Sequence, residues 1–160
     1  GSDTARFRYF LKSPLEAFRH LKDLPRREPD NELGHNAAGG WMVLVLLGML
    51  ALQVVTGLFS NDDDSFVEGP LRHLVSKPVS DWFSECHEVL FNVIMVAVVL
   101  HVAAIVVYLV VKGHNLVRPM ITGSKTIAGP VAAPALVNPI RAVVIVIAAA
   151  ALVAGLVRFL

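Results

Sequence analysis

Cysteine is almost absent from this chain: Cys86 is the only one among 160 residues. A single thiol excludes an intramolecular disulfide framework, a CxxC metal site and the CxxCH motif that attaches a c-type haem. Net charge is also small, because 14 Lys and Arg face 13 Asp and Glu, so we expect no nucleic-acid partner. The sequence contains no nucleophile–base set, phosphate-binding loop or zinc signature, which argues against most classes of enzyme.

What the chain has instead is three long apolar segments, at residues 37–59, 89–111 and 140–157. The first is uncharged over 23 residues, enough for a helix to cross about 30 Å of hydrocarbon. The mean hydropathy of +0.62 is too high for an ordinary water-soluble domain. We therefore predict an all-α integral membrane protein, a helical bundle with three transmembrane helices and membrane lipid as its main surroundings.

The second span is expected to begin before its apolar core. Ser80 and Asp81 form a good N-cap pair and Glu85 follows, so we place the helix start there and the span at about 81–111. Lys112 and Gly113 form a typical helix end, a cation followed by glycine. The remaining boundaries follow: 1–36 is a linker segment, 37–125 the membrane domain, and 126–160 an irregular connection with an additional C-terminal span.

Charge in the connecting segments predicts the orientation. Residues 1–36 contain seven Lys or Arg, and the segment after the second span contains three, including Arg118. The 60–80 segment contains only two, against four acidic residues. By the positive-inside rule, the N-terminal segment and residues 112–138 face the cytoplasm of a multi-pass membrane protein.

Apolar residues recur at helical spacing in the basic N-terminal segment. They are Phe7, Phe10, Leu11, Leu15, Phe18 and Leu21. This pattern is typical of an amphipathic helix on the inner leaflet, interrupted near Pro14. A linker packed on its own protein is an equally good interpretation.

Two histidines lie at membrane depth in the second span. His87 and His101 are fourteen residues apart, so both face one side of the helix, separated by about 21 Å along its axis. An ionisable side chain in this setting is costly and indicates function. The spacing suits one axial ligand for each of two stacked haems, although packing or hydrogen bonding between helices is the alternative. The small residues Gly48 and Gly57 on the first span either admit a flat macrocycle or make ordinary helix contacts.

Other polar residues are secondary candidates. His35 and Arg118 lie at the cytoplasmic boundary, where either is a candidate contact for a haem propionate or a quinone headgroup. A helix cap formed with Asn36 is the alternative at His35, and an anchoring charge is the alternative at Arg118. We expect His20 and His73 to be exposed to solvent.

Four sequence features resemble the bacterial cytochrome b561 family, which includes the b-type cytochrome subunit of Ni-Fe hydrogenases. They are Gly-His-Asn-Ala-Ala-Gly-Gly-Trp-Met at 34–42, Val-Thr-Gly-Leu-Phe at 55–59, the pair His87 and His101, and His-Asn-Leu-Val-Arg-Pro-Met-Ile-Thr-Gly at 114–123. The resemblance covers about residues 1–125. It implies a four-helix membrane bundle that holds two b haems, each with two histidine ligands.

The resemblance assigns His87 and His101 as haem iron ligands on one late helix. It also implies that the opening residues follow the family's second span, so the chain is the C-terminal part of a dihaem four-helix cytochrome. The second ligand of each haem is then expected from a missing N-terminal segment or another membrane chain, and less plausibly from His35 or His114.

The resulting hypothesis is an electron carrier. A membrane-bound dihaem b-type cytochrome would transfer electrons between the quinone pool and a periplasmic redox partner, such as a c-type cytochrome or another redox subunit of the respiratory chain. The sequence leaves open whether one end of this electron carrier also has quinone oxidoreductase activity. The alternative from another class is a haem-free membrane anchor or scaffold subunit of a larger complex.

Overall fold

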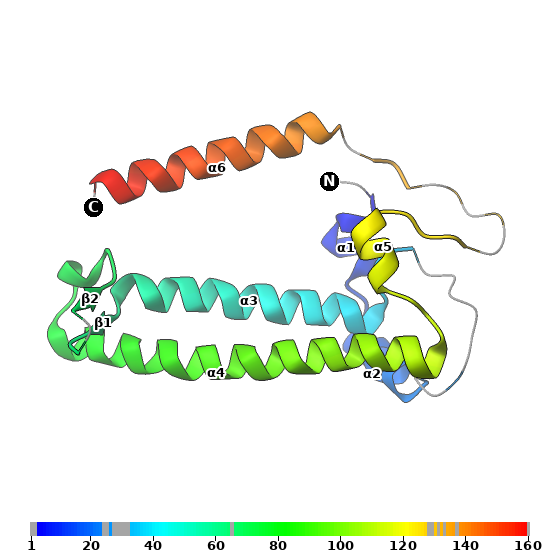
Figure 1. Ribbon diagram of the computed structural model, residues 1–160, viewed down its shortest axis with the longest axis horizontal. Helices are drawn as coiled ribbons and strands as arrows, with labels where there is room; N and C mark the ends of the chain where they lie inside the picture. The colour runs from blue at the N-terminus through cyan, green and yellow to red at the C-terminus, as the bar shows by residue number, and fades with distance from the viewer. Residues whose placement is uncertain are drawn as a thin grey trace. The chain divides into compact units, whose positions relative to one another are not determined.

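The computed structural model describes residues 3–23, 26, 33–64, 66–127, 130, 132, 134–136 and 138–159, and the fold is all-α (Figure 1). The α-helices are α1 (Phe7–Phe10), α2 (Pro14–Lys22), α3 (Ala37–Phe59), α4 (Lys77–Val107), α5 (Val117–Thr122) and α6 (Pro139–Phe159). Single 3-10 turns occupy Asp3–Ala5 and Arg72–Leu74, and a π-helical turn occupies Tyr108–Lys112. Two-residue strands, β1 (Asn61–Asp62) and β2 (Val67–Glu68), pair antiparallel in the connection between α3 and α4. Three of the described helices are long and apolar enough to cross a membrane: α3, α4 with its π turn, and α6.

The chain divides into two compact units. One comprises residues 1–46 with 96–136, and the other comprises residues 47–95 with 137–160. The helices α3 and α4 therefore each contribute to both units. In the second unit, the last part of α3 and the first part of α4 lie side by side and antiparallel (Figure 1).

The first long helix, α3, has the bounds that its apolar run predicts. Its start is capped by Asn36, whose side-chain oxygen accepts a hydrogen bond of 2.7 Å from the backbone N–H of Gly39. This cap satisfies one of the amide groups that a helix leaves unpaired in its first turn. Its apolar side chains are largely exposed on the protein surface, as expected for a helix that faces lipid.

The second long helix begins earlier than expected. Lys77 is the first residue of α4, so the prediction that Ser80 and Asp81 cap its start is wrong. Ser80 is instead fully buried inside the first turns of α4. The far end agrees with the prediction: after the π turn, Gly113 adopts a left-handed conformation with φ 75°, which favours glycine.

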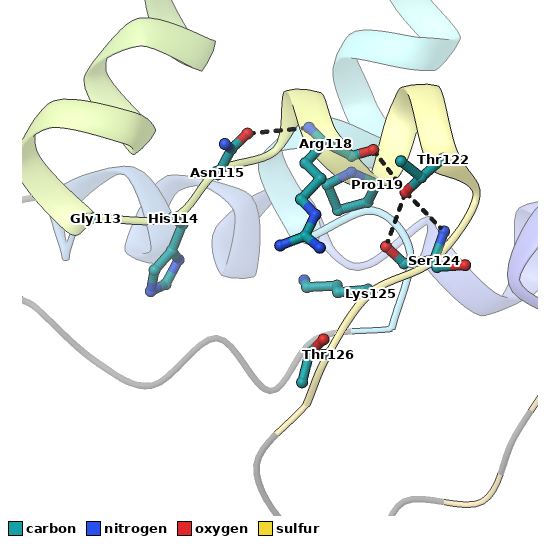
Figure 2. Close-up of a pocket in the computed structure, with 9 residues that line it drawn as sticks. All are labelled: Gly113, His114, Asn115, Arg118, Pro119, Thr122, Ser124, Lys125 and Thr126. Carbon is teal, nitrogen blue, oxygen red and sulfur yellow. Dashed lines mark hydrogen bonds between the residues drawn. The ribbon is translucent and has the colours of Figure 1, made fainter.

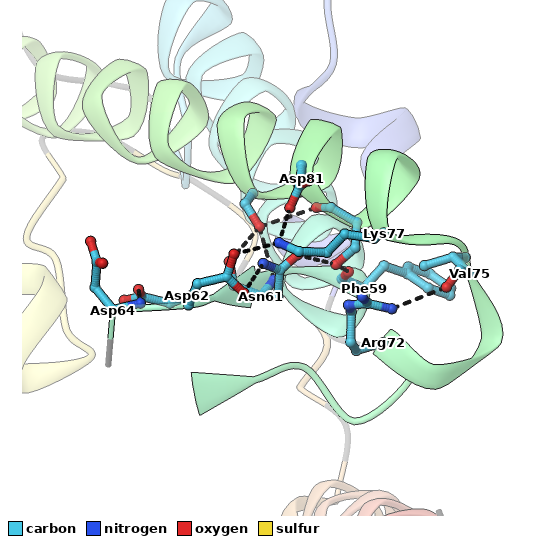
Figure 3. Close-up of polar contacts among 11 residues, drawn as sticks. Phe59, Asn61, Asp62, Asp64, Arg72, Val75, Lys77 and Asp81 are labelled. Carbon is cyan, nitrogen blue, oxygen red and sulfur yellow. Dashed lines mark hydrogen bonds and ion pairs between the residues drawn. The ribbon is translucent and has the colours of Figure 1, made fainter. Parts of the chain in front are cut away.

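The Ser80 hydroxyl does form a hydrogen bond with the backbone, as a cap would, but the partner belongs to the neighbouring helix α3. The hydroxyl lies 2.8 Å from the Phe59 carbonyl oxygen, an orphan acceptor at the end of α3, and also reaches the Asn61 side-chain oxygen. Figure 3 shows Phe59 and Asn61 beside Lys77 and Asp81. One turn later, the Ser84 hydroxyl donates to the Asn61 carbonyl and accepts from the Asn61 N–H. Lys77 adds ion pairs of 2.6 Å to Asp63 and Asp81. These contacts join the end of α3 to the start of α4.

Ser80→Ala is expected to destabilise this junction. The substitution leaves the Phe59 carbonyl oxygen without its hydroxyl donor in a buried site, which typically costs about 1–3 kcal/mol. Thermal unfolding in detergent, followed by circular dichroism, measures the loss. The control Ser124→Ala removes an exposed hydroxyl and should change stability by less than about 0.5 kcal/mol. Equal unfolding temperatures for the two variants would contradict the role of Ser80.

The N-terminal segment packs on the start of α3. Phe10 is buried, and it lies so close to Gly40 that a Cβ atom there would overlap the Phe10 backbone. The Trp41 indole N–H donates to the Lys12 carbonyl at 3.0 Å. As predicted, the helix is interrupted at Pro14, where Ser13 caps α2.

Part of the segment's apolar surface remains uncovered. The exposed residues are Phe7, Leu15, Phe18 and Leu21. The N-terminal segment is therefore packed on its own protein, yet it keeps an apolar face. Contact of that face with the inner leaflet stays a prediction.

Candidate functional site

Helix α4 carries both of the predicted haem ligands. It is uninterrupted from Lys77 to Val107, so His87 and His101 belong to one continuous helix. His87 lies in the unit that contains the end of α3, and His101 lies in the unit that contains the N-terminal segment. Each histidine is therefore described with its own surroundings.

His87 is held by the last turns of α3. Its Nδ1 atom lies 3.1 Å from the Gln53 carbonyl oxygen and 3.0 Å from the Thr56 hydroxyl. Its Nε2 atom lies 3.0 Å from the Gln53 side-chain nitrogen. These three contacts orient the imidazole from a helix that is more than thirty residues away in the sequence.

The contacts define one tautomer of His87. A carbonyl oxygen only accepts and an amide nitrogen only donates, so Nδ1 carries the proton and Nε2 carries the lone pair. This is the arrangement of a metal-ligating histidine, in which the second nitrogen donates to a carbonyl oxygen that holds the ring in place. The Gln53 side-chain oxygen is buried and has no hydrogen-bond partner among the described residues. The Gln53 amide nitrogen therefore has a hydrogen-bond partner among these residues and its oxygen has none, which is unusual for a buried polar group.

Gly57 lies directly against the His87 ring. A Cβ atom at this position would lie 3.0 Å from Cε1 and 3.3 Å from Nδ1 of the imidazole. The small residue is required here because a side chain would displace the ring. Gly48, on the same helix, has nothing within 4 Å of a Cβ atom, so only one of these two glycines has a contact role.

His101 has a different environment. Its side chain is half-buried, and it forms no hydrogen bond, ion pair or ring contact within the described ranges. Its neighbours on α4 are apolar, among them Leu100, Val102 and Ala103. A polar ring left without a partner in such a place is destabilising unless a ligand or another chain completes it.

His35 and Arg118 do not join either histidine. The exposed His35 ring lies 5.4 Å from the Phe10 ring, centroid to centroid, whereas the neighbouring Asn36 caps α3. Arg118 is an exposed residue of α5 and lines a pocket of about 350 Å³. Figure 2 shows its guanidinium between the side chains of His114 and Lys125. This pocket is cationic, but His101 is not among the residues that line it.

His20 is a polar contact residue that the sequence did not indicate. We expected this residue to be exposed, but its Nε2 atom lies 2.6 Å from the Tyr108 hydroxyl, and the two rings stack with centroids 6.2 Å apart. Asn36 donates to the same hydroxyl at 2.8 Å. The expectation was wrong because the contact joins residues 88 positions apart. Tyr108, a phenol at the end of an apolar helix, was the one signal that a polar partner was needed.

Comparison with known families identifies the chain. Residues 3–123 match prokaryotic cytochrome b561. This chain belongs to the prokaryotic cytochrome b561 family. No curated protein and no solved structure gave a significant match. As a cytochrome b561 protein with three apolar helices, it is an all-α, multi-pass membrane protein of electron transfer that binds b-type haem. The matched region ends before α6.

The residues around His87 fit the haem that membership in the cytochrome b561 family implies. The Nε2 lone pair is a suitable axial donor, Nδ1 is anchored on a carbonyl oxygen, and Gly57 leaves room for the imidazole ring. In this structure the Nε2 lone pair accepts a hydrogen bond from the Gln53 side chain, so haem iron would take the place of that amide. Within the described residues, no group of three or more His, Cys, Asp or Glu side chains is arranged to hold a metal ion alone. Haem differs because the porphyrin itself supplies four of the iron ligands.

Proposed function

We propose that this cytochrome b561 protein carries electrons between the quinone pool and a periplasmic redox partner, with His87 and His101 as axial ligands of two b haems. The observation that carries the proposal is the pair of contacts that anchor His87 Nδ1 on α3 and so assign the lone pair to Nε2. Bound haem would supply one-electron oxidation and reduction of its iron. The protein would contribute the axial imidazoles, their orientation and a surrounding of low polarity.

The first test is optical. Protein purified from membranes, together with any chains that accompany it, should show the split absorption bands of a b-type cytochrome after reduction by dithionite. Family membership favours this outcome over the haem-free scaffold. A preparation without these bands would support the scaffold and contradict the proposal.

The proposal includes an arrangement of the chain in the bacterial inner membrane. Residues 37–125 form the cytochrome domain, 1–36 a cytoplasmic segment, and 126–160 a connection and an added span. In this orientation the acidic 60–80 segment faces the periplasm, so His87 lies toward that side and His101 toward the cytoplasm. The second axial ligands come from an N-terminal segment or another membrane chain. Quinone would react at one end, with His35 or Arg118 as candidate contacts.

A groove beside His87 supports a basic redox partner on the periplasmic side. The groove has a volume of about 1080 Å³ and extends from the connection between α3 and α4 to His87 and Phe91. Among the residues that the structure describes, seven carboxylate side chains and no lysine or arginine line it. The carboxylates belong to Asp62, Asp63, Asp64, Glu68, Asp81, Glu85 and Glu88. Such a surface attracts a positively charged protein, such as a lysine-rich c-type cytochrome, and accelerates its association at low salt.

Neutralising the outer part of the groove is therefore expected to slow electron transfer. The triple variant Asp62→Asn, Asp64→Asn and Glu68→Gln changes three exposed carboxylates. It should reduce the second-order rate of oxidation by a lysine-rich c-type cytochrome roughly tenfold at low salt and weaken the salt dependence. Stopped-flow spectroscopy of the reduced haem measures both effects.

The matched control neutralises two acids on the N-terminal segment, Glu16→Gln and Asp23→Asn. It should leave the rate unchanged, because that segment lies on the opposite side of the membrane in the proposed orientation. If both sets of variants slow the reaction equally, the groove is not the docking site.

A further inference from the structure

The π-helical turn that follows α4 contains a buried cation, Lys112, with no carboxylate partner among the described residues. Lys112 is only 8% exposed, and no acidic side chain of the described residues forms an ion pair with it. Its ammonium group lies 5.7 Å from the centroid of the Tyr108 ring. A cation–π contact of this kind contributes about 1–2 kcal/mol, less than the cost of burying an unpaired ammonium. Within the part of the chain that the structure describes, no carboxylate offsets the charge of Lys112.

Two other nitrogen groups contact the same tyrosine. The Tyr108 hydroxyl, itself in a side chain only 7% exposed, lies within hydrogen-bond distance of His20 Nε2 and of the Asn36 side-chain nitrogen. We call these residues the Tyr108 cluster: His20, Asn36, Tyr108 and Lys112. They come from α2, from the cap of α3 and from the end of α4, and all belong to one unit. The cluster is rich in donors and contains no acid.

Tyr108, at the centre of the cluster, lies on the same face of the helix as His101. Tyr108 follows His101 by seven residues, which is two turns of α4 or about 10.5 Å along the same face. The Lys112 side chain points back along the helix, because its ammonium group lies over a ring four residues earlier. A π-helical turn forms this part of the helix, and such turns are frequent at functional sites. The cation is thus presented on the His101 face, about two turns from the ring.

We propose that the Tyr108 cluster binds a propionate carboxylate of the haem that has His101 as its axial ligand. The inference rests on the proposed function. Haem carries two propionates on one edge, and their negative charges need hydrogen-bond donors and a cation in a site of low polarity. Lys112 supplies the charge, and the hydrogen-bonded side chains of His20, Asn36 and Tyr108 supply the polar surroundings. His35 and Arg118, the candidates from the sequence, lie outside this cluster.

The test is a potentiometric titration of both haems in the purified complex. Lys112→Met should retain both haems but lower the midpoint potential of the haem that is lost in His101→Ala, because an uncompensated propionate stabilises ferric iron. Lys112→Arg should restore most of the potential. Tyr108→Phe keeps the ring and removes the hydroxyl, so it should give a smaller shift in the same direction, and it decides the question if Lys112→Met does not accumulate. The control Lys12→Met removes an exposed lysine and should change neither potential.

Three outcomes would overturn the inference. Unchanged potentials in Lys112→Met and Tyr108→Phe would make the cluster a purely structural contact. Equal shifts of both haems would mean a general effect of charge. A shift that occurs only in vesicles of anionic lipid, and not in neutral detergent, would assign the cluster to a lipid phosphate. Absence of haem from the unmodified complex would instead contradict the proposed function, so the two failures are distinguishable.

Discussion

His101→Ala is expected to remove one of two b haems and to leave the other intact. The imidazole is the only strong donor of α4 in its unit, and alanine cannot replace it as an iron ligand. Haem content, measured as the pyridine haemochrome and normalised to protein, should fall by about half. The remaining absorption bands of the dithionite-reduced protein should match those of the haem at His87.

The reciprocal variant completes this experiment. His87→Ala should lose the other haem, so the two reduced spectra should sum to that of the unmodified protein. His35→Ala and His73→Ala, which remove exposed imidazoles, should keep both haems. Full haem content in both His87→Ala and His101→Ala would show that the ligand assignment is wrong, and loss of a haem in His35→Ala would promote His35 to a ligand.

Gly57→Leu is expected to abolish binding of the haem at His87, although His87 itself is unchanged in this variant. A Cβ atom at position 57 would lie 3.0 Å from Cε1 of the imidazole, so the ring must shift even before the three further carbons of leucine are accommodated. The ring then loses its contacts to Gln53 and Thr56, which hold it in the ligating tautomer. The haem content of purified protein should again fall by about half, while the haem at His101 keeps its spectrum and potential.

The same substitution at Gly48 is the control. A Cβ atom there meets nothing within 4 Å, so Gly48→Leu adds equal volume and hydrophobicity to α3 on an open face. It should leave both haems in place. If Gly48→Leu and Gly57→Leu have the same effect, the close contact between Gly57 and His87 does not determine ligand binding.

The long helices were predictable because lipid imposes a simple requirement on sequence. A segment that spans hydrocarbon must be apolar for about twenty residues, and this length is visible without any knowledge of packing. The bounds of α3 agree with the prediction to the residue, and Gly113 ends the helical segment begun by α4 as expected. The start of α4 was misplaced because Ser80 hydrogen-bonds to another helix, and a local capping pattern looks the same whether the partner is near or distant in the chain.

Part of the candidate site was also predictable from the sequence, and part of it depends on how the helices pack. The helical period alone places His87 and His101 on one face, and their assignment as haem ligands stays a prediction. The roles of Gln53, Thr56 and Gly57 depend on the rotation of α3 about its axis relative to α4. Gln53 and Thr56 lie three residues apart in an otherwise apolar helix, so the face that they share is the one polar signal of that rotation in the α3 sequence.

By itself, the sequence determined that this protein is helical, that it lies in a membrane, and that two imidazoles lie along one helix. Each of these follows from local rules, namely apolar length and helical period. Only the tertiary structure decided which glycine lies against His87, that Ser80 joins two helices, and that His20 and Asn36 contact Tyr108. These contacts join residues 19 to 88 positions apart, and they form only when whole helices pack at one particular rotation and depth.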